Sequence, residues 1–498
     1  MEWPSGVHKQ LLEVAIAIED PLTFKHAPPV MEWELQLSSS FNLQQEVLRY
    51  TLCLFASVLV GAGIRLLKSP TARHLYSMMS GAALIYIAFG AGILHVLIPS
   101  ALTYLAMALS PKHCGALAWA INLAYLQYVH FGNMAGPTPP AMDFTGSQMV
   151  LFLKLISIAV CYQDYRVKKR EDMTPYQVEH ALARLPSPLQ FLSYVFSLGN
   201  LLAGPSIEYA EYEEFIEHKG VWSPTAQPQP CPNGFKPGCI AFFKSLVFLM
   251  AFLHLVPRIG ISTLFTEDYR ALPGALKTLA LFAAGLSSQF KYCFAWMLME
   301  AGCIFAGLGF EGWEAVDGKT RPKWSRCSNV SFFKMLFTAE STRMITVHWN
   351  KATGNFLRRY VYERLAGKRR PGFKELMITQ LVNAMWHGLA PRYLTFFVNS
   401  VFFIQFSSVI SRLEGLLPEA VAKSYPWRGL KVFWSNFIVC YIVLAFHIIG
   451  VHNTWAIWST VEFWPNILII VGSLVGPYVL PAPRRRKEQD GAGKTKAA

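Results

Sequence analysis

The sequence predicts an all-α, polytopic integral membrane protein. Three observations lead to this fold class: 53% of the 498 residues are hydrophobic, the mean hydropathy is +0.30, and many uncharged apolar runs are long enough to cross a bilayer. A spanning helix needs roughly 20 mostly apolar residues, or about 17 at the short end. We therefore expect about eleven transmembrane helices, within about two, together with short amphipathic or re-entrant helices.

The clearest spans are low-charge runs between short polar loops. They lie near residues 50 to 67, 147 to 162, 239 to 257, 391 to 411, 431 to 451 and 463 to 480. Longer apolar tracts must fold back within themselves, because each exceeds one crossing. These tracts cover residues 75 to 131, 272 to 310 and 376 to 411. Segment 189 to 204 is short and runs into Gly204-Pro205, which favours a re-entrant or broken helix.

Polar segments suggest three parts. Residues 1–47 carry scattered acids and no continuous apolar run, so we expect an amphipathic or loose lead-in rather than a cleavable signal peptide. Residues 48–480 form one transmembrane domain, in which the basic, amphipathic segment 311–375 adjoins the candidate site. Residues 481–498 are expected to form a basic, disordered tail in the cytosol.

The net charge of +14 is concentrated in three short loops, within residues 166 to 170, 351 to 374 and 484 to 487. Because Lys and Arg favour cytoplasmic loops, these loops and the C-terminus are placed in the cytosol. Attraction to lipid headgroups is one reading of the segment 351 to 374, and binding of a polyanionic substrate is the other. Charge confined to juxtamembrane loops argues against nucleic-acid binding. Lys494 and Lys496 resemble a dilysine retrieval signal of the endoplasmic reticulum, although a merely solvated tail is the alternative.

One titratable ring stands where the chain otherwise avoids polar groups. His387 lies inside the apolar stretch 376 to 410, and burying a polar ring without partners costs about 1 to 3 kcal/mol. If this stretch is helical, Gln380 and Asn383 fall on the same face as His387. Intramembrane ionisable groups usually face a cavity, a substrate path or each other, so we expect a polar cavity beside this stripe.

A second polar group, His348-Trp349-Asn350, has its amide 37 residues before His387. An Asn and a His so far apart cannot meet on one helix, but two helices leaning together bring them into one cavity. A neutral imidazole can accept a proton from an alcohol, and Asn350 can either hydrogen-bond the developing oxyanion or orient the ring. No serine or cysteine nucleophile stands in a recognisable setting nearby, which favours direct transfer between two bound substrates over an acyl-enzyme.

Each candidate has a structural alternative. A histidine on an apolar helix is more often satisfied by a backbone carbonyl than catalytic, and Asn350 alone is also typical of a helix cap or loop. Glu300 lies in an apolar run and shares a helical face with Tyr292 and Trp296, so it requires a buried partner or lines a cavity. The remaining candidates are expected to be structural; they are His254, His348, His447 and His452.

The sequence offers no metal or cofactor motif: Gly-rich phosphate loops, HExxH, GxSxG and Walker patterns are absent. Its nine cysteines are mostly single residues within apolar helices and form no CxxC or zinc pattern. Cys231 and Cys239 flank a polar loop and are compatible with a disulfide if that loop is lumenal. We expect no metal and no cofactor.

Several blocks of sequence occur in a fixed order. The later ones are His348-Trp349-Asn350, the run Phe356-Leu357-Arg358-Arg359-Tyr360-Val361-Tyr362-Glu363-Arg364, then Arg370-Pro371-Gly372-Phe373, and Asn383-Ala384-Met385-Trp386-His387-Gly388-Leu389. Blocks at 202 to 215 and 292 to 313 precede them. Together, over roughly residues 160 to 480, they resemble the core of membrane-bound O-acyltransferases, most closely the lysophospholipid acyltransferases of plants and fungi.

By this resemblance, His387 matches the family's catalytic histidine and Asn350 its second polar residue. The implied reaction moves a fatty acyl group from acyl-CoA to the free hydroxyl of a lysophospholipid, with acyl-CoA as co-substrate and no cofactor. The implied architecture is a helical bundle around a tunnel, which CoA enters from the cytosol and the lysolipid from the membrane. The expected substrate-binding residues are Trp349, Trp386, Gln380, Asn383, Glu300, Arg358, Arg359 and Arg392.

The chain departs from the family's pattern at one place near the candidate site. Where the family often has Pro-Gly-Tyr after the Trp-His-Gly triplet, this sequence has Pro391-Arg392-Tyr393, and we expect Arg392 to favour an anionic headgroup. An acyltransferase for a neutral lipid or a protein is an alternative, but the Phe-Tyr-x-Asp-Trp-Trp-Asn pattern of the neutral-lipid branch is missing. A lipid transporter or scramblase is less favoured, since no paired, repeated halves are found.

Overall fold

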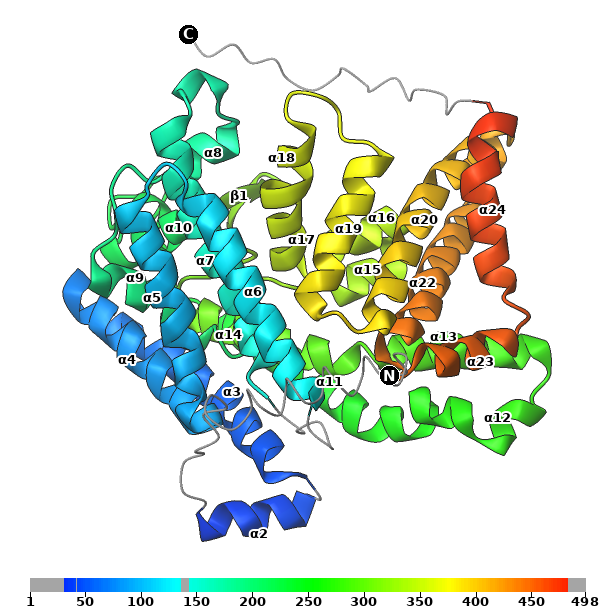
Figure 1. The fold of residues 1–498 in the computed structure, drawn as a ribbon, viewed down its shortest axis with the longest axis horizontal. Helices are drawn as coiled ribbons and strands as arrows, with labels where there is room; N and C mark the ends of the chain where they lie inside the picture. Colours follow the sequence, from blue (N-terminus) through cyan, green and yellow to red (C-terminus); the bar gives the residue numbers. More distant parts are fainter. Residues whose placement is uncertain (1–30, 42, 136–142, 482–498) are drawn as a thin grey trace.

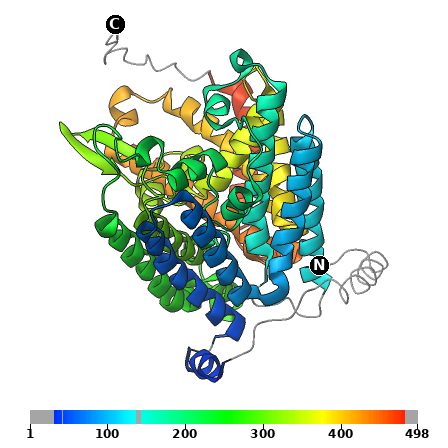
Figure 2. The ribbon, with the colours of Figure 1, turned by 90° about the vertical axis from the view of Figure 1, so that its left-hand side faces the viewer.

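The structure, a computed structural model, describes residues 31–41, 43–135 and 143–481. Nearly all of this part of the chain is helical, and the helices pack into one bundle (Figures 1 and 2). Six helical segments are long and apolar enough to cross a membrane, and a pair of helices bent by 96° makes a possible seventh. The all-α membrane fold is confirmed, whereas the expected number of eleven spans is not.

The first third of the bundle is organised around one buried helix. Its helices are α2 (Glu32–Phe41), α3 (Gln45–Gly63), α4 (Pro70–Phe89), α5 (Leu94–Leu109), α6 (Cys114–Ala135), α7 (Thr145–Val167) and α8 (Pro175–His180). Side chains are buried around most of the circumference of α7, and α5 and α6 pack along it. Burial on most sides places α7 in the interior, as a central helix of the fold.

The middle third contains the predicted broken segment and a helix with a largely exposed apolar surface. Its helices are α9 (Pro188–Phe196), η4 (Ser197–Gly199), α10 (Tyr209–Glu217), α11 (Phe235–Ile259), α12 (Glu267–Ala271), α13 (Gly274–Ser287) and α14 (Phe290–Ala306). The short α9 breaks at η4, as predicted for this segment. On α11, Phe243, Val247 and Met250 are exposed, which is the surface that a lipid-facing span presents.

The last part holds the candidate site. It comprises β1 (Gly312–Val316), β2 (Lys319–Lys323), α15 (Phe332–Thr338), α16 (Thr342–His348), α17 (Lys351–Leu357), the π-helical turn η7 (Arg358–Tyr362), α18 (Glu363–Ala366), α19 (Phe373–His387), α20 (Pro391–Glu414), α21 (Glu419–Ala422), α22 (Tyr425–His447), α23 (Val451–Ser459) and α24 (Trp464–Val479). The spans expected near 391, 431 and 463 correspond to α20, α22 and α24, of which α24 belongs to the bent pair.

The β1–β2 hairpin was not predicted. It is antiparallel, pairs Val316 with Lys319, and projects from the bundle (Figure 2). Its two connecting residues, Asp317 and Gly318, both have positive φ, at 52° and 71°. A two-residue turn of this kind matches the twist of the strands, and Asp-Gly is its usual sequence. The Asp-Gly dipeptide was the sequence signal for this hairpin, but the polar segment around it did not show the alternating pattern of a strand.

Two other expectations concern a disulfide and the two ends of the chain. Cys231 and Cys239 are both free, so the proposed disulfide does not form in this structure. The lead-in and tail expected from the sequence lie mostly outside the described residues, because residues 1–30 and 482–498 are not among them.

Close helix packing depends on glycines at two crossings. A Cβ on Gly285 in α13 would overlap the backbone oxygen of Cys440 in α22. A Cβ on Gly61 in α3 would overlap the backbone oxygen of Gly302 in α14. Small residues let helix backbones approach closely in membranes, where apolar burial alone gives helices little reason to associate.

We predict that Gly285→Ala destabilises the protein. In an open helix alanine would be favoured over glycine by about 1 kcal/mol. Here the added methyl must push α13 from α22, and overpacking typically costs about 1 to 3 kcal/mol. The measurement is the melting temperature of the purified protein in detergent. Gly274→Ala on the same helix is the control, because no atom lies within 4 Å of its added Cβ. Equal melting temperatures for the two variants would contradict the packing argument.

Candidate active site

The predicted polar helix is present, and the ring of His387 lies at its last residue. α19 ends at His387. Phe397 stacks on the imidazole with ring centroids 5.2 Å apart, while Phe446 and Tyr393 approach it at 4.8 Å and 5.7 Å. The side chain is partly exposed. Within the described ranges neither ring nitrogen has a hydrogen bond, so the site presents an unpaired imidazole in an aromatic setting.

The backbone at the end of α19 is anchored by two other helices. Gln127 in α6 donates its side-chain N–H to the Met385 carbonyl over 2.7 Å, and His130 Nε2 lies 3.1 Å from the Trp386 carbonyl. The indole of Trp386 in turn donates to the Met149 carbonyl in α7 over 3.0 Å. The last carbonyls of a helix lack the usual intrahelical partners, and the bonds from Gln127 and His130 engage two of them, while the indole bond holds the same turn against α7. Trp386 therefore acts as an anchor.

Gly388 is required by the same packing. Its φ is +110°, a conformation that residues with a Cβ rarely adopt. A Cβ built there would lie 3.1 Å from the His130 ring. The glycine of the Trp-His-Gly triplet thus lets α6 approach the end of α19.

The polar stripe carries unsatisfied groups. The side-chain oxygens of Gln380 and Asn383 are buried and have no hydrogen-bond partner among the described residues, and the Gln127 oxygen is in the same state. Leaving a buried acceptor unpaired costs about 1 to 3 kcal/mol. Such a cost is typical of a surface that completes its hydrogen bonds with a ligand or water. This arrangement agrees with the polar cavity expected beside the stripe.

Asn350 is held by a second asparagine. It stands between α16 and α17 with left-handed backbone angles, φ 42° and ψ 57°. Asn329 Nδ2 donates to Asn350 Oδ1 over 3.3 Å, and Asn329 also accepts from the backbone N–H groups of Lys351 and Ala352 at 2.9 Å each. The Asn350 oxygen is therefore engaged as an acceptor. Its amide N–H groups remain as donors.

An aromatic wall connects the two predicted catalytic segments. Trp349, next to the candidate amide, lies 6.0 Å from the Tyr292 ring. The Tyr292 ring is also 6.0 Å from His447, which follows the Phe446 ring that packs on His387. Trp349 and His387 thus border one continuous aromatic surface. Among the described contacts no hydrogen bond joins the amide to the imidazole.

Glu300 belongs to α14, and its side chain lies near Lys351 at the start of α17. Its carboxylate interacts with the Ser328 side chain and with the charge of Lys351, whose Nζ is 3.3 Å from Ser328 Oγ. The acid therefore has the buried partners that the sequence required of it. These contacts hold the turn beside Asn350, so Glu300 supports the amide rather than lying beside the imidazole.

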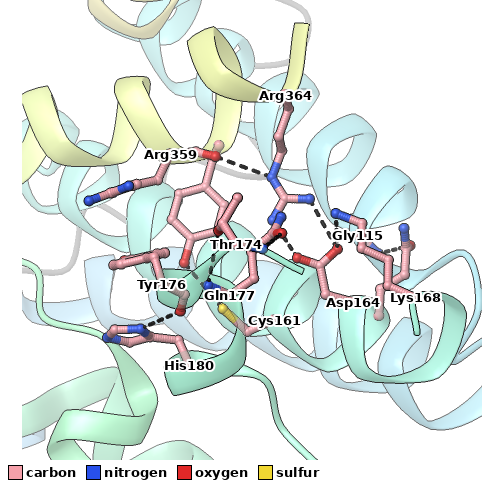
Figure 3. Close-up of polar contacts among 12 residues, drawn as sticks. Gly115, Cys161, Asp164, Lys168, Thr174, Tyr176, Gln177, His180, Arg359 and Arg364 are labelled. Carbon is pink, nitrogen blue, oxygen red and sulfur yellow. Dashed lines mark hydrogen bonds and ion pairs between the residues drawn. The ribbon is translucent and has the colours of Figure 1, made fainter. Parts of the chain in front are cut away.

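Arg358 and Arg359 are engaged by a neighbouring acid. Arg358 Nε and Arg359 Nη1 lie 2.7 Å and 3.1 Å from the carboxylate of Glu363. The guanidinium of Arg359 also stacks on Tyr176, at 4.4 Å from the ring centroid (Figure 3). Arg358 and Arg359, which the sequence predicts to bind substrate, therefore share one carboxylate in this structure.

The same region is joined to α7 and α8 by a polar cluster (Figure 3). Arg364 forms a two-pronged ion pair with the buried Asp164 of α7, at 2.5 Å and 3.1 Å. The hydroxyls of Tyr176 and Tyr360 donate to the two oxygens of Glu208, at 2.6 Å and 2.8 Å. Burial raises the pKa of the Glu208 carboxyl, and the two phenol donors offset part of that effect. The cluster ties the sequence block at 202 to 215 to the block at 356 to 364.

Two described cavities lie away from His387. One is lined by Ser57, Asn200 and Met299, and the other by Thr342 and Ser407 among others. The tunnel implied by the resemblance therefore stays a prediction.

Sequence reasoning missed four residues that position the site: Gln127, His130, Asn329 and His447. Gln127 and His130 lie one turn apart on α6, a spacing that indicated a polar face on an apolar helix. Asn329 gave no local signal, because its partners are reached only through the fold. His447 was expected to be structural, yet its ring lies in the aromatic wall beside the candidate site.

A comparison with known families decides the class of protein. The model of the membrane-bound O-acyltransferase (MBOAT) family matches residues 135–449. The chain belongs to the membrane-bound O-acyltransferase family. The match includes α16 through α20 and therefore both predicted catalytic residues, whereas the anchors of α6 precede it.

Similar proteins cover almost the whole chain. Lysophospholipid acyltransferase 1 of Arabidopsis thaliana is 33% identical over 466 residues, covering 91% of this chain and 99% of the relative. Lysophospholipid acyltransferase 2 of the same plant is 33% identical, with 91% and 98% covered. A lysophospholipid acyltransferase of Schizosaccharomyces pombe is 28% identical, with 88% and 87% covered. The resemblance to the plant and fungal members is confirmed.

For this acyltransferase-family member we predict that Gly388→Ala both destabilises the fold and displaces His387. A residue forced into a sparsely populated backbone region costs about 1 to 3 kcal/mol, and the new methyl also presses on His130. The measurements are the melting temperature in detergent and acyl transfer by the same preparation. Gly429→Ala in α22 is the control, since nothing lies within 4 Å of its added Cβ. A Gly388→Ala protein with wild-type melting and turnover would refute this role.

Proposed function

We propose that the protein is a lysophospholipid acyltransferase, which transfers a fatty acyl group from acyl-CoA to the free hydroxyl of a lysophospholipid. The observation that carries the proposal is the unpaired imidazole of His387, fixed at the end of α19 and surrounded by aromatic rings. Membership of the O-acyltransferase family and similarity to proteins named lysophospholipid acyltransferase support the reaction class and the acceptor.

The proposed chemistry is direct transfer. His387 accepts the proton of the lysophospholipid hydroxyl while the hydroxyl oxygen attacks the thioester carbonyl. The tetrahedral intermediate then expels the sulfur of CoA, the carbon–sulfur bond breaks, and the imidazolium returns the proton to the thiolate. The products are a diacyl phospholipid and CoA. No serine or cysteine is hydrogen-bonded to the ring within the described ranges, which supports a route without an acyl-enzyme.

Asn350 is proposed to stabilise the oxyanion of that intermediate. An amide donor is what a developing negative charge needs, and the oxygen of this side chain is already occupied by Asn329. The left-handed backbone and the Asn329 contacts hold the amide in place before the substrates bind. Such preorganisation is the usual source of oxyanion stabilisation.

The proposed setting is the endoplasmic-reticulum membrane, with the C-terminus in the cytosol. The basic segments at 166 to 170 and 351 to 374, the second of which is largely helical, are joined where Lys368 of one pairs with Asp172 beside the other. The charge bias supports a cytosolic location for these segments, where acyl-CoA is available. The lysophospholipid is proposed to enter from the bilayer.

We predict that His387→Ala lowers the rate of acyl transfer by about 10² to 10⁴, the usual range for removing a general base. The assay supplies membranes or purified protein with labelled acyl-CoA and a panel of lysophospholipids, diacylglycerol and an acceptor peptide. His113→Ala is the control, because His113 is exposed outside the site. Unchanged turnover in His387→Ala would remove the mechanism. Transfer only to diacylglycerol or peptide would reassign the acceptor, and lipid movement without acyl-CoA consumption would favour a scramblase.

We predict that Asn350→Gly lowers the maximal rate by about 10² to 10³, the range reported for the loss of one oxyanion donor. Glycine accepts the left-handed backbone, so this variant removes the amide without adding strain. Asp317→Gly, which replaces another residue of positive φ in the hairpin turn, is the control. The maximal rate and the KM for each substrate are measured together. A wild-type maximal rate in Asn350→Gly would show that the amide has no part in the reaction.

A further inference from the structure

A cation lies beside the aromatic wall at the start of α20. Arg392 is the second residue of α20, and its guanidinium stacks over the Tyr393 ring at 4.7 Å from the centroid. Its Nη2 donates to the Tyr393 hydroxyl over 2.8 Å, but Nε is buried and has no hydrogen-bond partner. Tyr393 itself packs on the His387 ring. The guanidinium is therefore one aromatic ring away from the proposed base.

A second cation approaches from another helix. Lys291 is the second residue of α14 and lies over the Tyr292 ring, 5.1 Å from its centroid. Tyr292 contacts His447, and the charges of Lys291 and Arg392 both act on that histidine. Lys291 is exposed, whereas Arg392 is partly buried. The two cations thus flank the outer edge of the wall that surrounds His387.

Neither cation has a counter-charge among the described residues. No acid there forms an ion pair with Lys291 or Arg392, in contrast to Arg364, which pairs with Asp164. Each also stands in the first turn of its helix, and neither first turn contains an acid. Because the N-terminus of a helix carries a partial positive charge, a cation there is unfavourable unless an anion is nearby. Two such turns together make a region of uncompensated positive potential.

A phosphate fits this arrangement best. The guanidinium offers a planar fork that matches two phosphate oxygens, and the lysine ammonium adds a point charge. Arg392 Nε is a donor that such an oxygen would satisfy. The surrounding rings of Tyr292 and Tyr393 leave the cations few competing acceptors.

The position indicates which phosphate. The phosphate of a lysophospholipid is only a few covalent bonds from its free hydroxyl, so one molecule can reach both the cations and His387. We expect the phosphates of CoA to bind elsewhere, at the basic segment before α19. The 15 residues of α19 separate that segment from His387 by roughly 22 Å.

We propose that Lys291 and Arg392 together bind the phosphate of the acceptor lysophospholipid and thereby hold its free hydroxyl at His387. This inference rests on the proposed function, since it names the part of the acceptor that the site recognises. It makes Arg392 and Lys291 specificity residues for phosphate-bearing acceptors.

The test compares Arg392→Gln, Lys291→Gln and the double variant in nanodiscs. KM and kcat are measured separately for lysophosphatidylcholine, lysophosphatidic acid and oleoyl-CoA. We expect KM for both lysophospholipids to rise about tenfold for each lost charge-assisted contact, with KM for oleoyl-CoA near wild type. Lys291→Arg should retain most of the affinity. Lys236→Gln is the matched control, because Lys236 is also an exposed lysine at the second position of a helix, α11.

The outcomes are distinct. Unchanged KM for both lysophospholipids in the double variant would overturn the inference while leaving the proposed function intact. A rise only in KM for oleoyl-CoA would assign the cations to the donor and also overturn it. If the wild type transfers acyl groups to no lysophospholipid, the proposed function fails instead. The phosphate site is then tested by whether lysophosphatidic acid raises the melting temperature of the wild type but not of the double variant.

Discussion

The structure depends on how the last turn of α19 is held. Three hydrogen bonds, from Gln127, His130 and the indole of Trp386, connect this turn to α6 and α7. The bonds from Gln127 and His130 reach carbonyls at the end of α19, whereas the Trp386 indole donates to a carbonyl of α7, and none of them uses an atom of the following imidazole. The end of the helix is consequently anchored, and among the described residues neither nitrogen of the His387 side chain has a hydrogen-bond partner. A positioned but unsatisfied base is what proton transfer in an apolar site requires.

The aromatic wall gives this arrangement its chemical character. Stacked and edge-on rings limit the positions the imidazole can adopt, and they offer it no competing acceptor. The same wall extends through Tyr292 and His447 to the segment that carries Asn350. At its outer edge lie Lys291 and Arg392, two cations that form no ion pair with any described acid. The proposed base, amide donor and anion site are thus arranged around one apolar surface, as a reaction between a thioester and a phosphate-bearing alcohol would use them.

The features that were predicted from the sequence are those set by local hydropathy and helical periodicity. The spans at α3, α7, α11, α20 and α22, the break after α9, and the common face of Gln380, Asn383 and His387 all follow from hydropathy and helical periodicity. Contacts between distant segments were not predictable in this way. Asn329 holds Asn350, and His130 meets Gly388, only because separate helices cross there. The expected eleven spans are not confirmed, because several apolar segments among the described residues, such as α13 and α14, are shorter than one crossing.

The central claim is that the acyl group passes directly from the thioester to the lysophospholipid hydroxyl with the His387 imidazole as base, and one measurement tests it most directly. Purified protein is mixed with acyl-CoA alone, and released CoA is followed before and after a lysophospholipid is added. The account predicts no stoichiometric burst and release that begins only with the acceptor, because His387 has no nucleophile hydrogen-bonded to it within the described residues. Release of one equivalent of CoA per protein before the acceptor is present would contradict the account, since it requires a covalent acyl-protein.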